Sequence, residues 1–137
     1  MSYQWDASLE TGYEKVDNQH KQLVSTLNSL IESSKQGKDK EEIFKVVDFM
    51  TGYAIMHFKT EEDLMVKYEY NDYYVHKQYH EEFKVTVGEL TKRLVDEGPT
   101  ERMISIVTSV IGDWLVNHIK GDDFKMAVFV KSKDKSS

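Results

Sequence analysis

Apolar residues return every three to four positions in four long stretches of the chain, the period of an α-helix with one buried side. These stretches are residues 18–36, 40–67, 72–97 and 100–120. Their stripes consist, in chain order, of Leu23, Val24, Leu27, Leu30 and Ile31; of Ile43, Val46, Val47, Met50, Tyr53, Ala54, Phe58, Leu64 and Met65; of Phe83, Val87, Leu90 and Leu94; and of Ile104, Val107, Ile111, Trp114 and Leu115. Four amphipathic helices with short loops predict an all-α fold, an up-down-up-down four-helix bundle.

The segments outside these helices predict an arm at one end of the chain and a tail at the other. Residues 1–16 carry apolar side chains without helical spacing, so we expect an N-terminal arm laid against the bundle. Residues 122–130 form a short apolar-rich ending, and the charged residues 131–137 predict a frayed tail. Because neither a linker nor a repeat interrupts the pattern, residues 1–137 are expected to form a single domain.

Capping residues mark the expected helix boundaries. Asp17 is the expected N-cap of the first helix, and Gly37 its expected stop. Asp39 is expected to cap the second helix in the same way. The fourth helix is expected to follow Gly98 and to end at Gly121.

Composition then excludes several classes of function. The 137 residues include no cysteine, which rules out disulfides, thiolate metal ligands and cysteine nucleophiles. Lys and Arg number 18 against 24 Asp and Glu, a formal charge of −6, so a nucleic-acid partner is not expected. No run of about 18 apolar residues predicts a membrane span, and the first residues lack the pattern of a signal peptide. We therefore expect a cytoplasmic protein.

All five histidines fall on the apolar stripes. A single core histidine is more often an ordinary buried residue than a ligand, but five of them would each need buried hydrogen-bond partners. In an antiparallel bundle, the first and third helices begin where the second and fourth end. The histidines occupy these four places, as His20, His57, His76, His80 and His118. Their convergence at one end of the bundle predicts a metal site.

A carboxylate joins the histidines on the second helix. Glu61 follows His57 by one helical turn and lies on the apolar side, where an unpaired carboxylate is costly. Its neighbour Glu62 is expected to point into solvent. Glu61 is therefore a candidate ligand, with a buried salt bridge as the ordinary alternative.

A second carboxylate is expected just beyond the fourth helix. On a continuous helix Asp123 would point away from His118, but a break at Gly121 would let the chain curl back toward the site. Spacing alone does not choose between Asp122 and Asp123.

These candidate ligands are imidazoles and carboxylates without sulfur, a set that suits iron, manganese or zinc. Two six-coordinate ions need about twelve ligand positions, and five histidines, two bridging carboxylates and a bridging oxygen fill about eleven. The remaining position, in an apolar pocket, is where a small molecule would bind. Two rival motifs are absent: the Glu-x-x-His pairs of ferritin-like centres and the His-Glu-x-x-His helix of zinc proteases.

Motifs that span about residues 5–130 point to one family. They are Trp5 in the arm; Asp17-Asn18-Gln19-His20; His57-Phe58-Lys59-Thr60-Glu61-Glu62; His76, His80 and Phe83; and Trp114-Leu115-Val116-Asn117-His118-Ile119 followed by Asp123. This combination resembles the hemerythrin family, in particular the bacterial oxygen-binding members. One departure is Tyr70-Asn71, where the family often has Tyr-Pro; it affects a turn and no ligand.

The resemblance implies a non-haem di-iron centre and selects Asp123 over Asp122. One iron would be bound by His76, His80 and His118. The other would be bound by His20 and His57 and would keep the open position. Both would be bridged by Glu61, Asp123 and an oxo or hydroxo group. The apolar O₂ pocket would consist of Leu23, Phe58, Trp114, Leu115 and Ile119.

Similarity to this family implies reversible O₂ binding, for transport, storage or delivery, by a protein that is not an enzyme. The alternatives are a di-iron sensor domain and a di-iron enzyme that acts on peroxide or nitric oxide. An enzyme would need an acid or base in the pocket, and the implied lining is apolar, which favours binding. The expected partners are O₂ and a redox partner or an oxidase that receives it. The chain itself is expected to be a monomer.

Overall fold

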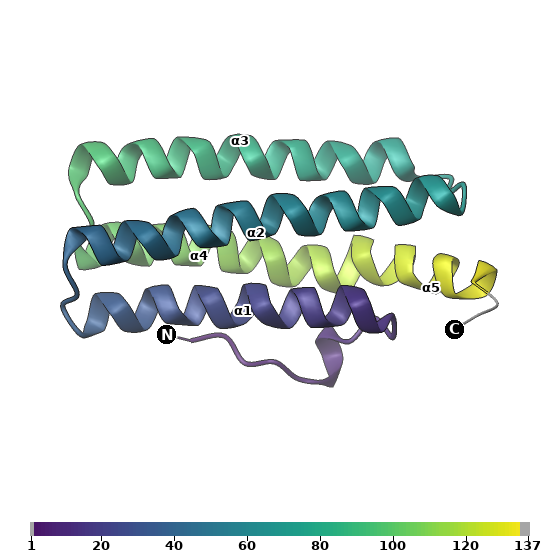
Figure 1. Ribbon diagram of the computed structural model, residues 1–137, viewed down its shortest axis with the longest axis horizontal. Coiled ribbons are helices and arrows are strands. Elements are labelled where there is room, and N and C mark those ends of the chain that lie inside the picture. Colours follow the sequence, from purple (N-terminus) through teal and green to yellow (C-terminus); the bar gives the residue numbers. More distant parts are fainter. Residues whose placement is uncertain (1, 135–137) are drawn as a thin grey trace.

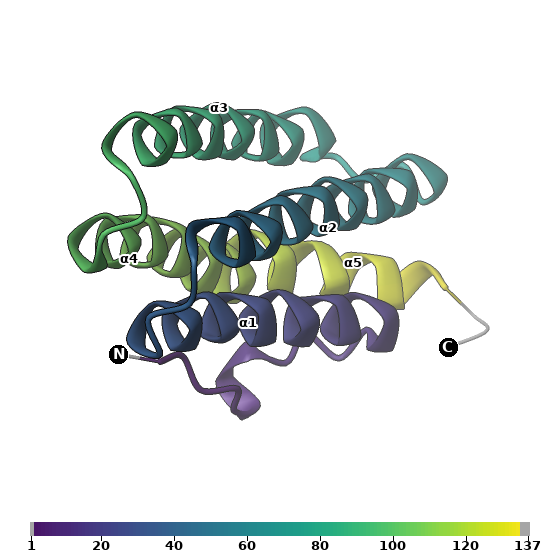
Figure 2. The same cartoon turned by 60° about the vertical axis from the view of Figure 1, so that its left-hand side comes forward.

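The computed structural model describes residues 2–134, which form helices and connecting turns without a strand. The four long helices are α1 (Glu14–Lys35), α2 (Lys40–Lys67), α3 (Tyr73–Glu97) and α4 (Glu101–His118). Contacts join α1 to α2, α2 to α3, α3 to α4 and α4 back to α1, so the helices form a closed ring. Figures 1 and 2 show them running side by side in alternating directions, which confirms the up-down-up-down bundle. Within residues 2–134, none of the helices combines the length and the apolar character needed to cross a membrane.

Local hydrogen bonds explain most of the helix ends. The Asp39 carboxylate accepts a hydrogen bond from the Glu42 N–H at 2.9 Å, as expected of an N-cap. Thr100 caps α4 by accepting from the Met103 N–H at 3.1 Å. Gly37 has a φ of 68°, a left-handed conformation that costs glycine little. It prevents the helix from continuing just after α1.

The expected start of α1 at Asp17 is wrong. The helix begins at Glu14, and Asp17 lies inside its first turn. Its carboxylate accepts hydrogen bonds from the Thr11 N–H at 2.9 Å, the Thr11 hydroxyl at 2.7 Å and the Gly12 N–H at 3.1 Å. Asp17 therefore fastens the end of the arm to the helix instead of capping the helix.

The expected stop at Gly121 is also wrong. The chain continues through one π-helical turn, η2 (Ile119–Asp123), into a further helix, α5 (Phe124–Lys133), which extends the line of α4 (Figure 1). A glycine lowers helix stability by only about 1 kcal/mol, and burial of Met126 and Val130 outweighs that cost. Residues 131–133 are helical instead of frayed, and residues 135–137 lie outside the described part.

The segment before α1 packs against the bundle. The Tyr3 N–H donates to the Asn28 side chain at 2.8 Å, and the Asn28 amide donates back to the Tyr3 carbonyl at 2.7 Å. Leu9, in the 3₁₀ turn η1 (Ala7–Leu9), is buried in the core. The Tyr3 ring crosses α4 at Gly112, where a Cβ would lie 2.1 Å from it. Gly112 thus permits a close approach that any side chain would block.

Two apolar clusters of unequal size make up the core. The main cluster fills most of the space between the four helices. The smaller one, here called the cap cluster, consists of Val16, Met65, Tyr70, Met126 and Val130. On α2, the order is Phe58 in the main cluster, then Glu61, then Met65 in the cap cluster. Glu61 thus marks a buried polar layer between the two clusters.

Candidate metal centre

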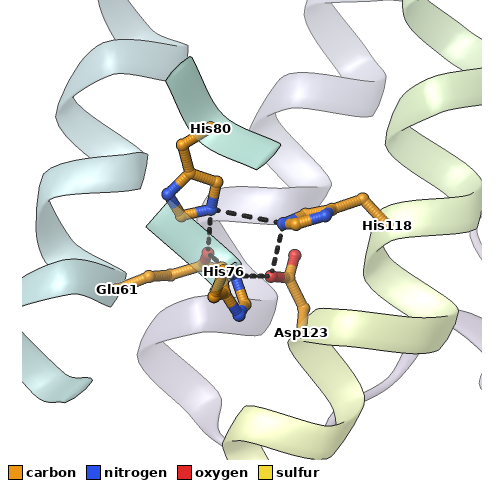
Figure 3. A group of neighbouring side chains, drawn as sticks. All are labelled: Glu61, His76, His80, His118 and Asp123. Carbon is orange, nitrogen blue, oxygen red and sulfur yellow. Dashed lines mark hydrogen bonds and ion pairs between the residues drawn. The ribbon is translucent and has the colours of Figure 1, made fainter. Parts of the chain in front are cut away.

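All seven predicted ligands meet in this layer. Each is buried, with at most 5% of its surface exposed. They come from α1 (His20), α2 (His57 and Glu61), α3 (His76 and His80), the end of α4 (His118) and the end of η2 (Asp123). Figure 3 shows five of them, whose imidazole and carboxylate groups point toward one another.

Helical spacing explains why most of these residues share a face. His57 and Glu61 are four residues apart on α2, as are His76 and His80 on α3, so each pair stacks one turn apart. His118 and Asp123 are five apart, which an α-helix would place on different faces. The π turn accommodates the extra residue, and the Asp123 Oδ1 lies 3.0 Å from the His118 Nε2. A wider turn thus does what was expected of a helix break.

The carboxylate of Glu61 faces histidines on both sides. Its Oε2 lies 2.9 Å from the Nε2 of His57 and 3.3 Å from that of His20. Its Oε1 lies 3.1 Å from the Nε2 of His80 and 3.3 Å from that of His76. One carboxylate therefore presents one oxygen to each of two histidine groups.

Asp123 repeats this arrangement from the opposite side of the bundle. Its Oδ2 lies 2.9 Å from the Nε2 of His20, and its Oδ1 lies 3.0 Å from that of His76. The ligand atoms accordingly fall into two groups that share both carboxylates. One group is His20, His57, Glu61 and Asp123; the other is Glu61, His76, His80, His118 and Asp123.

Although these atoms lie close together, most of them lack a hydrogen bond. Both oxygens of Glu61 and of Asp123 and the Nε2 atoms of His20, His57 and His76 are buried without a hydrogen-bond partner in the described part of the chain. An unsatisfied buried polar atom costs about 1–3 kcal/mol, and more if it is charged. Nitrogen and oxygen atoms that converge on one buried space in this way fit cations between them. The imidazole and carboxylate set suits iron.

The charges of the site explain the pKa values of the metal-free protein. Burial alone would lower the pKa of His20 and of His76, but the carboxylates of Asp123 and Glu61 outweigh it. They raise the pKa of His20 to about 9 and that of His76 to about 10. Burial would raise the pKa of Glu61, but the imidazoles around it hold that pKa well below its usual value. Without metal, the site therefore balances its anions with protons.

Three residues that the sequence did not assign to the site contact the Nδ1 atoms of histidine rings, on the side away from the buried carboxylates. The Nδ1 of His57 lies 2.7 Å from the Gln19 side-chain oxygen, and that of His80 lies 2.8 Å from a Glu62 oxygen. When Nδ1 donates, the lone pair of Nε2 points into the site. The expectation that Glu62 is only solvated is wrong, because this contact crosses from α2 to α3. Gln19 precedes His20 on α1, a position that gave no sign of a contact with α2.

The third of these residues is Asp122, on the solvent side of the site. Its Oδ2 lies 3.3 Å from the His118 Nδ1, and its side chain is 42% exposed. The two aspartates after Gly121 thus contact the two nitrogens of the same ring, with Asp123 inside and Asp122 at the rim.

Part of the predicted apolar pocket borders a cavity beside the ligand layer. Leu23, Phe58 and Leu115 line this cavity. The Phe58 ring stacks on the His80 ring, with centroids 4.0 Å apart. Trp114 and Ile119 do not line it: Trp114 stacks on His118 with centroids 4.4 Å apart, and Ile119 is buried in the main cluster.

Comparisons with known proteins agree on one family. Residues 11–130 match the family model described as hemerythrin HHE cation binding domain. A bacteriohemerythrin of Pseudomonas paraeruginosa is 34% identical over 119 residues, which are 87% of this chain and 75% of the relative. A myohemerythrin of Theromyzon tessulatum is 32% identical over 123 residues, 90% of this chain and 89% of the relative. The crystal structure of a wild-type hemerythrin superimposes with a TM-score of 0.81 at 30% identity, covering 93% of this chain and 97% of that one.

Proposed function

Because the chain belongs to the hemerythrin family, we propose that it binds O₂ reversibly at two non-haem iron ions between its helices. The observation that carries this proposal is that the two oxygens of Glu61 face two different groups of histidines. One oxygen lies within 3.3 Å of His20 and His57, and the other within 3.3 Å of His76 and His80. A carboxylate placed in this way fits a bridge between two cations.

The proposed ligands of one iron are His76, His80 and His118, and those of the other are His20 and His57. Glu61 and Asp123 would be shared by both ions. Since the second group of ligands has one histidine fewer, a position for O₂ would be left open on its side. This division is supported by the two groups into which the ligand atoms fall.

The iron pair, when bound, supplies the electrons that O₂ takes up. The chain supplies the surroundings. Gln19 and Glu62 orient the rings of His57 and His80 from behind. Leu23, Phe58 and Leu115 keep water from the inner side of the layer, which protects a charged bound species from release into solvent.

We propose binding instead of catalysis because the inner cavity offers no acid or base. Among the described residues that line it, the only side-chain polar group is the Thr51 hydroxyl, which donates to the Val47 carbonyl at 2.9 Å. General acid–base chemistry on peroxide or nitric oxide would need a titratable group there. In this proposal the protein is a monomer that carries, stores or delivers O₂, and a redox partner restores the reduced irons.

The proposal is tested by the optical spectrum of the iron-reconstituted, reduced protein. The spectrum is recorded without air, after air is admitted, and again after O₂ is removed under argon. Reversible binding predicts a new visible absorption band that appears with air and disappears with deoxygenation over several cycles. A spectrum that does not change with air, or that changes once and never returns, contradicts the proposal.

A further inference from the structure

A surface groove between α2 and α3 reaches the wall of the apolar cavity beside the ligand layer. The groove has a volume of about 320 Å³ and includes Lys84, Gly88 and Thr91 in its lining. The cavity has a volume of about 20 Å³ and includes Leu27, Met50 and Ile111. Five residues line both spaces: Thr51, Ala54, Phe58, Phe83 and Val87. Groove and cavity are therefore separated by a wall only one side chain thick.

The inner end of the cavity borders the proposed iron site. Phe58 lines the cavity and stacks on His80. Leu23 and Leu115, also in the lining, each lie three residues from a ligand, His20 and His118 respectively. The groove and the cavity thus lie one behind the other between solvent and the ligand layer.

The chemistry of the cavity selects a small apolar occupant. A buried water needs two to four polar partners, and cavities without them stay dry and take up apolar molecules such as xenon. The hydroxyl of Thr51 is already engaged with the Val47 carbonyl, and the other lining side chains are hydrocarbon or thioether. The cavity is large enough for one small molecule, since a single water-sized probe occupies about 10–15 Å³.

A second opening near the site has a different character. It lies on the α3–α4 side, with a volume of about 310 Å³, and its lining includes Tyr79, Asn117, His118 and Asp122. Its polar groups suit water and ions better than an apolar gas. It reaches His118 of the larger ligand group, whereas the apolar cavity includes Leu23, which lies three residues from His20 of the smaller group.

We propose that the α2–α3 groove is the entrance for O₂ and that the apolar cavity is a docking site for the gas on its way to the irons. This inference rests on the proposed function. It makes Gly88 the residue that keeps the entrance open, because a Cβ at this position would meet no atom within 4 Å and a larger side chain would project into free space in the groove.

The test is Gly88→Leu, with Gly52→Leu as its matched control. Gly52 is also an interior helix glycine with nothing within 4 Å of an added Cβ, but it lines neither space. Both substitutions replace glycine by a good helix former, so both variants should fold with melting temperatures at or above that of the original protein. O₂ association and dissociation rates are measured by stopped flow on the iron-loaded proteins. Xenon exchange with the cavity is measured by ¹²⁹Xe NMR on the same proteins without O₂.

A narrowed entrance slows entry and exit equally. Gly88→Leu should lower both O₂ rates and the xenon exchange rate by about tenfold or more, with the O₂ equilibrium constant unchanged. Gly52→Leu should leave all three rates within about twofold. Unchanged xenon exchange in Gly88→Leu overturns the proposed route. Slower xenon exchange with unchanged O₂ rates also overturns it, because O₂ then enters elsewhere. If the loaded protein binds no O₂ at all, the proposed function fails, while the xenon rates still decide whether the groove opens into the cavity.

Discussion

The two halves of the bundle are held together by different forces. Far from the ligands, Leu30, Leu94 and Val107 are nearly or fully buried among other apolar side chains, and burial of their surface is sufficient to pack the helices. In the ligand layer, imidazoles and carboxylates are buried just as completely, where each uncompensated charge opposes folding. The same four helices therefore contain an apolar half that is stable by burial alone and a layer whose charges, in our proposal, are balanced by cations.

The cap cluster lies beyond this layer, at the end of the bundle that holds α5. Met126 and Val130 reach the rest of the protein through Val16, Met65 and Tyr70, on the far side of the ligands from the main core. Five residues form a small cluster beside a core of about twenty, so α5 should depend on the layer for its stability.

Removal of the metal should have the largest effect. A metal ion that binds only the folded state, at a free concentration 1,000 times its dissociation constant, stabilises the fold by about 4 kcal/mol. Chelation of the metal removes that contribution. Calorimetry of the metal-free protein should show a clearly lower melting temperature. Hydrogen exchange should show loss of protection in α5 and retention in residues 43–54. Equal melting temperatures with and without metal would mean that the layer needs no cation.

The pH dependence of the metal-free protein should be the next largest effect. The pKa values of His20 and His76 are raised in the folded state, to about 9 and about 10, from an ordinary value of 6.5. The stability that protonation of these rings contributes is complete below about pH 6.5 and is lost as the pH rises through 9 and 10. The melting temperature of the metal-free protein should fall between pH 7 and pH 10. A flat profile would show that the carboxylates hold no protons on these rings.

Leu94→Ala tests whether the apolar half is independent of the layer. Leu94 is fully buried in the main cluster, so its truncation should cost about 2–5 kcal/mol of unfolding free energy. The loss should be the same with and without metal, and the iron content should be unchanged, since the site lies elsewhere. Chemical denaturation and metal analysis check both statements. A variant that folds but has lost iron would show that the two halves are coupled.

The smallest effect should come from replacing a residue that contacts a histidine ligand on its Nδ1 side. Glu62→Gln keeps the shape of the side chain but replaces the carboxylate that faces the His80 Nδ1, and such changes reduce metal affinity by about 10–100-fold. Glu82→Gln is the control, because it removes the same charge from an exposed position on α3. Competition with a chelator measures the affinity. Equal affinities for the two variants would reduce the Glu62 contact to a surface interaction.

The spacing of apolar residues predicted the features that recur in every helix. The four helices and the convergence of five histidines follow from apolar stripes, because burial imposes the same 3.6-residue period on every helix. The spacing did not predict the roles of residues that contact a separate segment of the chain. The pattern does not reveal that Asp17 binds the arm or that Glu62 reaches across to α3, since both contacts depend on how separate segments meet.

The continuation beyond Gly121 shows the same limit. Local preference favours a stop at this glycine, and the ending that follows is too short to display a clear period. Tertiary burial of Met126 and Val130 decides otherwise and produces η2 and α5. The π turn that aligns Asp123 with His118 results from this continuation.

We propose that one buried layer holds two cations that share Glu61. It is tested most directly by the iron content of the reconstituted protein, measured by elemental analysis against protein concentration after weakly bound metal has been removed. We expect two irons per chain in the original protein. A content of one iron per chain, or none, would contradict it.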